Sequence, residues 1–552
     1  MKNIKHRTSF IWTSAIVIFL LTILVSYKAV DFKTSKSLDI FFSLFRELTV
    51  FYVDKSDPEE LIKVGINAML DHLDPYNEFI PEEGKEQFDF QTTGEYGGMG
   101  ALIRHSKNYP IISEIYEGTP SQKVGLMVGD TILWINKENV KGKSVDNVSK
   151  MLKGAPKTSL NIWVRRQGHK DSLNFIFDRE KIHIPSVPYS GIIHEDVGYI
   201  KMASFTSDSY REVENALKEL KSKNATSIIL DLRGNPGGLL YEAVKTVNLF
   251  VEKNQLVVNT KGQIKEFDQE YKTPSKPIDA KIPLVVLVDR ASASASEIVA
   301  GALQDLDRAV IVGDRTFGKG LVQATRPLPY NTQLKVTTAK YYIPSGRCIQ
   351  AVDFSQRNED GSINFIPDSL VKAFSTKNGR KVFDGGGISP DKPFPVSFYS
   401  RVSSVLYARN MFFDYATRYR LSNTSISHPT SFSITNEEYD DFITFINNQG
   451  FEYQSQTEAS LKEFIETAKE EKYYSIAQNI IDSLQSVIEA NRNKDLLFFR
   501  EEIKSLLEEE IVSRYYYQKG RSEYMVNKDK ALNLCIEVLK DSKQYSSILT
   551  AQ

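Results

Sequence analysis

Two short segments of the chain carry side chains that could perform nucleophilic chemistry. Residues 292–297 hold three serines and a glutamate, and residues 316–323 hold Lys319 between two glycines, followed by Gln323. A serine hydroxyl becomes a nucleophile when a neighbouring base accepts its proton, and a lysine can be that base where burial disfavours its charged form. Gln323 could hold the lysine amine by a hydrogen bond without adding charge. The two segments therefore predict a serine–lysine site suited to acyl transfer.

The serine segment is predicted to lie at the turn between a strand and a helix. Residues 283–288 are an apolar, β-branched run typical of a buried parallel strand, and apolar residues recur at helical spacing over 297–306. The first N–H groups of a helix have no partner within the helix, so they could stabilise an oxyanion. A simpler interpretation is that Ser294 and Glu297 form a capping box that only begins the helix.

A glycine-rich turn is the second candidate element. Residues 227–231 are typical of a buried strand, apolar residues over 240–250 have helical spacing, and residues 231–238 join the two. Glycines in such a turn usually serve backbone shape. A phosphate-binding loop is disfavoured because the turn lacks a Gly-x-x-x-x-Gly-Lys-Ser/Thr pattern.

Further blocks accompany these segments along the chain, and the full series is 73–76, 96–100, 231–238, 292–297, Gly313 with 316–320, 344–347 and 387–391. In this order the blocks resemble the carboxyl-terminal processing proteases, also called tail-specific proteases, over residues 70–395. The resemblance implies that Ser294 is the nucleophile, Lys319 the general base and Gln323 the residue that orients the lysine. It also implies an oxyanion hole formed by the backbone N–H of Ala295 with that of Gly237 or Gly238, between which the sequence does not decide.

The resemblance further implies the fold class and the domain organisation. The expected fold is a multidomain α/β protein with a mixed-sheet, ClpP/crotonase-like serine peptidase core, an inserted PDZ domain, N-terminal helices and a helical C-terminal extension. We expect neither a metal nor an organic cofactor. The expected domains are a membrane anchor or signal segment at 1–29, an N-terminal helical region at 30–91, a PDZ domain at 92–180, the peptidase core at 181–400 and the helical extension at 401–552.

The expected PDZ domain contains five short apolar runs separated by glycine and proline, which predict five strands, and one helix is predicted at 144–152. Residues 96–100 directly precede the first run. Consecutive N–H groups there could bind a terminal carboxylate while the adjoining strand edge pairs with an extended peptide, although a flexible turn is the alternative. The resemblance implies a peptide-binding role for Tyr96, Gly97, Gly98, Met99 and Gly100.

The N-terminus carries a candidate membrane segment, because basic residues precede an uncharged stretch over 8–27. About 20 apolar residues span a bilayer, and no Ala-x-Ala-like cleavage site follows, so an uncleaved transmembrane helix is favoured over a signal peptide. The basic residues lie before the span. They therefore predict a single-pass protein of the cytoplasmic (inner) membrane, with its catalytic domains facing the periplasm of a Gram-negative host.

Composition disfavours several other classes of protein. The net charge is −1 without a basic stripe, which disfavours nucleic acid as a partner. The two cysteines lie in different expected domains, and the seven histidines lack the spacing of a zinc site, which disfavours a metalloprotease. A Ser-His-Asp arrangement that uses His72 or His194 stays open.

The helices predicted at both ends of the chain could bind partners. Apolar residues over 38–48 share one helical face and a second helix is predicted at 59–70, so these helices could pack on a second subunit. Further helices are predicted at 402–418, 436–448, 459–491, 494–517 and 529–545, with a Ser/Thr-rich linker at 421–435. They could form a lid, an adaptor-docking surface or an assembly element. The expected partners are protein substrates with unstructured C-termini, an adaptor or regulatory protein, a second copy of the chain, and the membrane.

The predicted function is a membrane-anchored serine endopeptidase that cleaves the C-terminal regions of extracytoplasmic proteins. The alternative is a catalytically silent or adaptor-dependent PDZ scaffold that binds peptides. The presence of Ser294, Lys319 and Gln323 disfavours that alternative.

Overall fold

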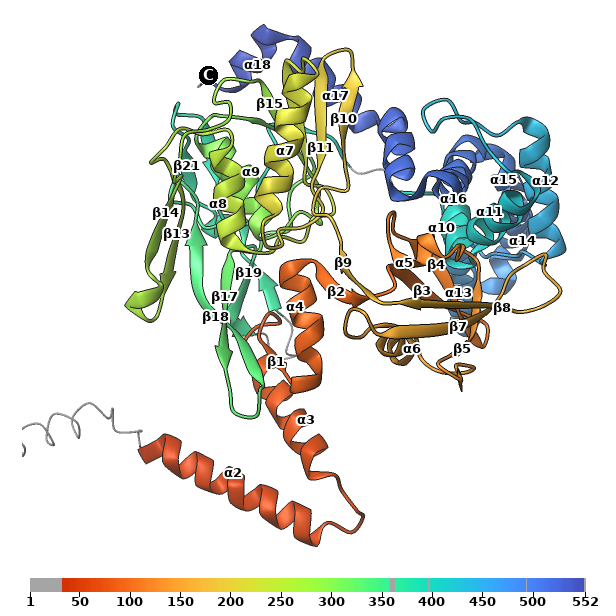
Figure 1. The fold of residues 1–552 in the computed structure, drawn as a ribbon, viewed down its shortest axis with the longest axis horizontal. Helices are drawn as coiled ribbons and strands as arrows, with labels where there is room; N and C mark the ends of the chain where they lie inside the picture. The colour runs from red at the N-terminus through yellow and green to blue at the C-terminus, as the bar shows by residue number, and fades with distance from the viewer. Residues whose placement is uncertain (1–31, 358–362, 396–397, 493, 551–552) are drawn as a thin grey trace, which may run out of the picture. The chain divides into compact units, whose positions relative to one another are not determined.

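The computed structural model describes residues 32–357, 363–395, 398–492 and 494–550 (Figure 1). The chain divides into a first compact unit that ends at Phe79 and a second that begins at Ile80. The described part of the first unit contains α2 (Phe32–Phe51) and α3 (Pro58–Asp71), and β1 (Glu78–Ile80) lies at the boundary. Asp57 begins α3 by accepting the N–H of Glu59 at 2.9 Å. The two helices predicted from the apolar spacing are thus confirmed.

The prediction of a transmembrane helix is contradicted. Among the described residues, no helix combines the length and the apolar character that crossing a bilayer requires. The helix α2 has 20 residues, but charged side chains interrupt it, namely Lys33, Lys36, Asp39, Arg46 and Glu47. The stretch over 8–27, on which the anchor was predicted, lies outside the described residues. The single-pass inner-membrane location is therefore not retained.

The centre of the second unit is a six-stranded sheet with the order β10-β11-β12-β15-β16-β23. The strand β10 is antiparallel to β11, and the other neighbours are parallel. The runs at 227–231 and 283–288 form strands, as predicted, and these are the two central strands of the sheet. The bounds are β10 (Tyr189–His194), β11 (Val197–Lys201), β12 (Ser227–Asp231), β15 (Leu284–Val288), β16 (Val310–Gly313) and β23 (Lys392–Pro393).

Both faces of this sheet are covered by helices. On one face lie α7 (Ser209–Ser222), α8 (Leu240–Asn248) and α9 (Ala295–Asp305) (Figure 1), and on the other lies α17 (Lys530–Lys540). Successive side chains of a strand point to opposite faces, so Ile228 and Leu230 pack with α7–α9 whereas Ile229 packs with α17. A helix from the end of the chain therefore completes the core.

A second, antiparallel sheet adjoins this core. It contains β17 (Leu321–Pro327), β18 (Gln333–Tyr342), β13 (Leu256–Gly262) and β14 (Gln269–Lys272), in that order. Smaller elements complete the region, namely η1 (Glu82–Gly84), η2 (Lys265–Phe267), β19 (Val352–Arg357), β20 (Ile363–Phe365), η3 (Asp368–Leu370), β21 (Ala373–Ser375) and β22 (Lys381–Phe383).

The region with the PDZ pattern forms its own sheet, with the order β3-β4-β5-β7-β8 and β6 paired with β5. Its buried core includes Ile112, Ile132, Val148 and Ile162. The five predicted strands and the predicted helix are all present. The bounds are α4 (Lys85–Thr93), β2 (Glu95–Gly98), β3 (Ala101–Ser106), β4 (Tyr109–Ile115), α5 (Pro120–Lys123), β5 (Thr131–Ile135), β6 (Glu138–Asn139), α6 (Val145–Leu152), β7 (Ser159–Arg165), β8 (Leu173–Asp178) and β9 (Glu180–His183).

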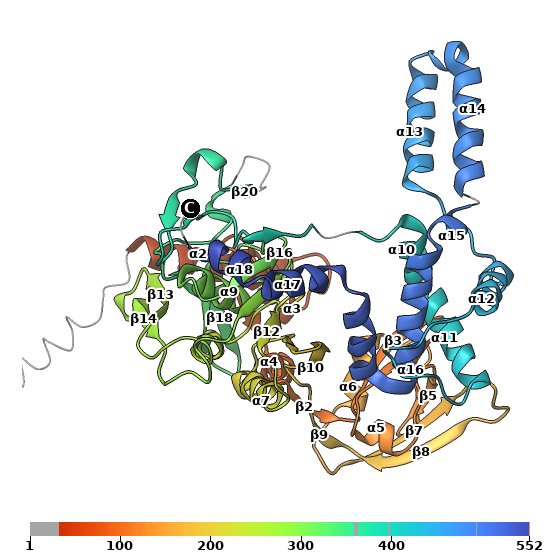
Figure 2. The same ribbon diagram turned by 90° about the horizontal axis from the view of Figure 1, so that it is seen from above.

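The C-terminal extension is helical, as expected, but its helices are divided differently. A single helix was predicted over 459–491, whereas Lys472 adopts a left-handed conformation, with φ 65°, and separates two helices that run side by side (Figure 2). The bounds are α10 (Arg401–Ala408), α11 (Met411–Ser422), α12 (Asn436–Asn448), α13 (Gln456–Glu470), α14 (Tyr474–Arg492), α15 (Asp495–Phe498), α16 (Arg500–Lys528) and α18 (Ser542–Ile548). The multidomain α/β class is confirmed, and the ClpP/crotonase-like description of the core stays a prediction.

Candidate active site

Ser294 lies at the predicted turn, between the end of β15 and the start of α9. Its backbone has φ 55° and ψ −112°, a conformation that a residue with a Cβ atom rarely adopts. Two other capping-box residues in the same chain, Thr435 and Ser455, have extended backbones with φ of −74° and −70°. A helix cap therefore does not need the strained backbone of Ser294.

The three serines, which their chemistry alone does not distinguish, differ in exposure and in hydrogen bonding. Ser292 and Ser296 are fully buried, and both hydroxyls donate hydrogen bonds to the neighbouring turn, Ser292 to Leu232 O at 2.8 Å and Ser296 to Asn235 O at 2.9 Å. Ser294 is partly exposed. Of the three, Ser294 is therefore the serine that a substrate can reach.

Glu297 joins the serine turn to the segment that carries Lys319. Its carboxylate is fully buried and one oxygen, Oε2, accepts the backbone N–H groups of Ser294 and Lys319, each at 2.9 Å. The other oxygen, Oε1, accepts the N–H of Gly318 at 2.7 Å and the hydroxyl of Thr316 at 2.6 Å. Two segments that are distant in sequence thus meet on one side chain.

The electrostatics of Glu297 reflect this buried position. Burial raises the pKa of Glu297 to about 7, because the charged form loses its hydration. The hydroxyl of Thr316 and the three N–H groups lower the pKa in part, since they bind the ionised carboxylate. All four partners donate to Glu297, so the arrangement suits the charged form.

Lys319 is half-buried. The glycines on either side of it allow this segment to lie close to a neighbouring segment of backbone. A Cβ atom on Gly318 would lie 2.4 Å from Ala351 Cβ, and one on Gly320 would lie 2.8 Å from Gln350 N. Gln323 lies in β17, where its Nε2 donates to Thr337 Oγ1 at 3.3 Å. The role of Gln323 towards the Lys319 amine stays a prediction.

The glycine-rich turn is held against the serine turn. A Cβ atom on Gly237 would lie 2.8 Å from Ser294 Cβ and 2.9 Å from Ala295 N, so the two turns are in direct contact. The Gly237 N–H donates to Asn235 Oδ1 at 2.9 Å. Within the described part of the chain, the N–H groups of Gly238 and Ala295 donate no hydrogen bond. This difference favours Gly238 over Gly237 as a donor to an oxyanion.

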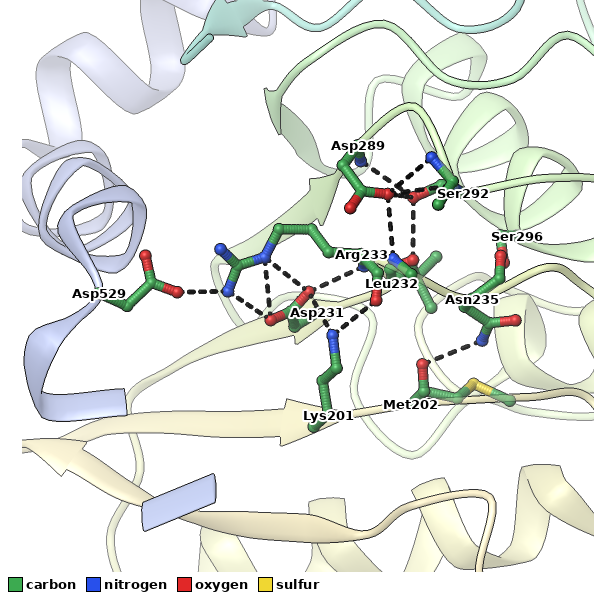
Figure 3. A network of polar contacts seen from close by, with 12 residues as sticks. Lys201, Met202, Asp231, Leu232, Arg233, Asn235, Asp289, Ser292, Ser296 and Asp529 are labelled. Atoms are coloured by element: carbon green, nitrogen blue, oxygen red, sulfur yellow. Dashed lines mark hydrogen bonds and ion pairs between the residues drawn. The ribbon is translucent and has the colours of Figure 1, made fainter. Parts of the chain in front are cut away.

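A network of polar contacts fixes the start of the glycine-rich turn (Figure 3). Asp231 is fully buried, accepts the Tyr199 hydroxyl at 2.7 Å and Arg233 Nη2 at 2.7 Å, and pairs with Lys201 at 3.3 Å. Burial alone would raise the pKa of Asp231, but the charges of Lys201 and Arg233 hold it well below its usual value. Asp231 is therefore a permanent anion that anchors the turn.

His194 lies away from these turns. It pairs with Val197, and Val197 pairs with Ser227 at the start of β12, whereas the glycine-rich turn follows the end of the same strand. The strand register thus places His194 at the opposite end of the strands from the glycine-rich turn. A Ser-His-Asp arrangement with His194 is not compatible with this register.

The PDZ region contains a pocket with a volume of about 280 Å³ between β3 and α6. Of the predicted peptide-binding residues, Tyr96 and Met99 line it. The predicted loop is partly a strand, because residues 95–98 form β2 and pair with β9. Position 97 requires glycine because its backbone lies close to that of Gly154. A Cβ atom on Gly97 would lie 2.1 Å from Gly154 O.

The sequence missed several residues of this arrangement. Glu297 was assigned only to a capping box, and Thr316 and Asn235 were assigned no role. A carboxylate in an otherwise apolar helical stripe was the available signal, because such a group is rarely buried without several donors. The contact between Arg233 and Asp529 could not be predicted from the sequence, because the two residues are 296 positions apart.

Three family models match parts of the chain. Peptidase family S41 matches residues 196–356, a PDZ domain matches 111–166, and a family described as the C-terminal helical domain of a probable PDZ-protease matches 402–539. Among solved structures, the photosystem II D1 C-terminal processing protease is 25% identical and covers 64% of this chain and 92% of its own. Its TM-score of 0.34 is too low for a comparison of how the parts are arranged.

Two relatives are more similar to this chain in sequence than that solved structure is. A probable CtpA-like serine protease of Staphylococcus aureus is 34% identical over 310 residues, which are 56% of this chain and 61% of that protein. A carboxy-terminal-processing protease of Bartonella bacilliformis is 34% identical over 323 residues, which are 58% of this chain and 74% of that protein. With this coverage and the family S41 match over the core, the chain belongs to the carboxy-terminal-processing proteases, a family of serine peptidases.

Proposed function

We propose that the protein is a serine endopeptidase in which Ser294 attacks the substrate carbonyl, Lys319 is the general base and Gln323 orients Lys319. The observation that carries the proposal is the shared oxygen of Glu297, which binds the N–H groups of Ser294 and Lys319. The strained and accessible backbone of Ser294 supports the same assignment.

The proposed reaction is an acyl transfer through Ser294. The Lys319 amine accepts the Ser294 proton while Oγ attacks the carbonyl carbon. The N–H groups of Ala295 and Gly238 stabilise the tetrahedral oxyanion. Lys319 then gives the proton to the leaving amine, and water releases the acyl group from Ser294. No metal or organic cofactor takes part.

We also propose that the pocket between β3 and α6 binds the unstructured C-terminus of a protein substrate. Apolar side chains such as Met99, Ile103 and Leu152 line the pocket and could take an apolar side chain of the peptide. Lys153 lines it as well, with Nζ 5.5 Å from the centre of the Tyr96 ring, and could meet the terminal carboxylate. The free edge of β3 would pair with the peptide backbone.

Two further partners are proposed on exposed apolar surfaces. Leu38 and Phe42 of α2 are 60% and 69% exposed, which supports a homodimer through the N-terminal helices. Ile476 and Ile480 of α14 are 82% and 74% exposed, which supports an adaptor-docking surface on the C-terminal helices. Sedimentation analysis of Phe42→Glu tests the dimer, because the variant should be monomeric at concentrations where the wild type is not.

The proposed function is tested by cleavage of a reporter protein with a disordered C-terminal tail. The wild type should cut the tail, and Ser294→Ala and Lys319→Ala should each lose the activity. Ser455→Ala is the matched control, because Ser455 begins α13 with the same Ser-x-x-Glu capping box and is also partly buried. If the wild type binds the tail but never cuts it, the peptide-binding scaffold is the correct function.

A further inference from the structure

An ion pair joins the start of α17, in the C-terminal extension, to the glycine-rich turn. Arg233 Nη2 lies between two carboxylates, those of Asp231 in the turn and of Asp529 at the start of α17 (Figure 3). The side chains of Arg233 and Asp529 are 26% and 21% exposed. A charge-assisted bond that is shielded from water in this way is stronger than an ordinary surface ion pair.

Asp529 is itself held in place by the core. Its Oδ1 accepts the N–H of Ala531 at 2.9 Å and so caps α17, and Leu532 and Cys535 of this helix are buried against the sheet. Burial would lower the pKa of Arg233, but the carboxylates of Asp231 and Asp529 raise it above its ordinary value. Arg233 therefore remains a cation bound on two sides.

The residues next to Arg233 hold the serine turn. Leu232 O accepts the Ser292 hydroxyl at 2.8 Å, and the Gly234 N–H donates to Asp289 Oδ1 at 3.0 Å. The Arg233 carbonyl accepts Lys201 Nζ at 2.6 Å. A shift of Arg233 would therefore move Leu232 and Gly234, and with them the contact between the two turns of the active site.

We propose that Asp529 is a positioning residue of the active site, which fixes Arg233 and thereby the turn that supplies the oxyanion donor. The C-terminal extension then completes the catalytic geometry as well as the core. This inference rests on the proposed function of Ser294, because it assigns Asp529 a part in that same reaction. Asp529 touches no reacting atom and acts through Arg233.

The test compares Asp529→Asn with a matched control in the full-length protein. Asparagine caps a helix as well as aspartate does, so α17 should still begin at the same residue while the charge is lost. The control is Asp541→Asn, because Asp541 caps α18 by accepting the N–H groups of Lys543 and Gln544, and within the described residues its side-chain hydrogen bonds do not reach the turn. We expect Asp529→Asn to lower kcat about tenfold with KM changed less than about twofold, since loosening a donor costs less than removing it. Asp541→Asn should leave both values unchanged.

A double-mutant cycle shows whether Asp529 acts through Arg233. In an Arg233→Gln background, Asp529→Asn should cost nothing further, because the ion pair is already lost. An equal loss of kcat in both backgrounds would overturn the proposal. So would an Asp529→Asn protein whose kcat matches that of the control.

Hydrogen exchange supplies a readout that does not depend on activity. The peptide that covers residues 231–239 should exchange faster in Asp529→Asn than in Asp541→Asn, and unchanged exchange would overturn the proposal. If the wild type shows no Ser294-dependent cleavage, the proposed function fails and the catalytic part of this inference fails with it, whereas the exchange result still decides whether Asp529 holds the glycine-rich turn.

Discussion

Glu297 accepts the backbone N–H of Lys319 at 2.9 Å on the same oxygen that accepts the N–H of Ser294. The carboxylate is fully buried, and hydrogen bonds to a charged acceptor are strong where water is excluded. The relative position of the two proposed catalytic segments is therefore set through their backbones by a residue that takes no chemical step.

Glu297→Gln should lower kcat at least about tenfold. The side-chain NH2 group would replace one acceptor oxygen and would face N–H donors, which leaves buried donors without partners. Steady-state cleavage of the tail reporter measures the effect, and circular dichroism checks that the variant folds. Glu458→Gln is the matched control, because Glu458 accepts the N–H of Ser455 in an equivalent capping box of α13. Equal activity of the two variants would contradict the role of Glu297.

The raised pKa of Glu297 predicts a pH dependence of stability. The folded state holds the proton up to about pH 7, whereas the ordinary pKa of the group is 4.5. The contribution of this carboxyl to stability is therefore complete below about pH 4.5 and is lost as the pH rises through about 7. Between these two pH values the free energy of unfolding of the wild type should fall by about 3 kcal/mol relative to that of Glu297→Gln. Urea unfolding of both proteins at pH 5 and pH 8 measures the difference, and parallel changes would refute it.

The same carboxyl predicts that activity rises with pH through about 7. The four groups around Glu297 all donate to it, so the ionised form should hold the Ser294 and Lys319 segments best. A pH profile of kcat on the tail reporter measures this, with an unrelated protease as a check on the reporter. A profile that falls over pH 6 to 8 would be inconsistent with the ionised form being the active one.

Gly237→Ala should abolish most of the activity, with kcat lowered more than about 100-fold. The new Cβ atom would lie 2.7 Å from Ala293 O and 2.8 Å from Ser294 Cβ, so the two turns would have to separate. Gly450→Ala is the control, because Gly450 lies just after α12 and also has a positive φ, 66°, but its Cβ atom would meet nothing within 4 Å. The control should lose about 1 kcal/mol of stability from backbone strain and should retain its kcat. Similar kcat values for both variants would argue against the contact.

Leu102→Asp should weaken peptide binding about tenfold, because a charged group would replace an apolar wall of the pocket. Fluorescence anisotropy with a labelled C-terminal peptide measures the affinity, and KM for the reporter should rise with kcat little changed. Ile176→Asp is the control, since Ile176 is an exposed apolar residue of β8 outside the pocket. If both variants bind as the wild type does, the peptide binds elsewhere.

Local patterns in the sequence were sufficient for the secondary structure around the site. The buried strands at 227–231 and 283–288 and the helix after Ser294 follow from β-branched runs and helical spacing, which are local signals. Local patterns did not predict the strain at Ser294 or choose among the three serines, because both depend on bonds from Ser292 and Ser296 to a turn about 60 residues away. Only the family resemblance selected Ser294.

Boundaries within the C-terminal helices were less predictable. Lys472 takes a left-handed conformation within a stretch of good helix formers, where no glycine or proline marks the turn. The helix predicted over 494–517 does end at Tyr517, because the backbone of Tyr517 has φ 54° and ψ −152° and is not helical, and Gln518 then contacts Glu114 of β4. The helix that follows this break within α16 was not predicted.

The central claim is that Ser294 is the nucleophile and that Lys319 activates it. The most direct measurement is labelling with a fluorophosphonate, followed by mass spectrometry of the digested protein. We expect the label on the peptide that contains Ser294. Ser455→Ala should be labelled as the wild type is, and Lys319→Ala should be labelled at least about 100 times more slowly. A label on another residue, or an unchanged labelling rate in Lys319→Ala, would contradict the claim.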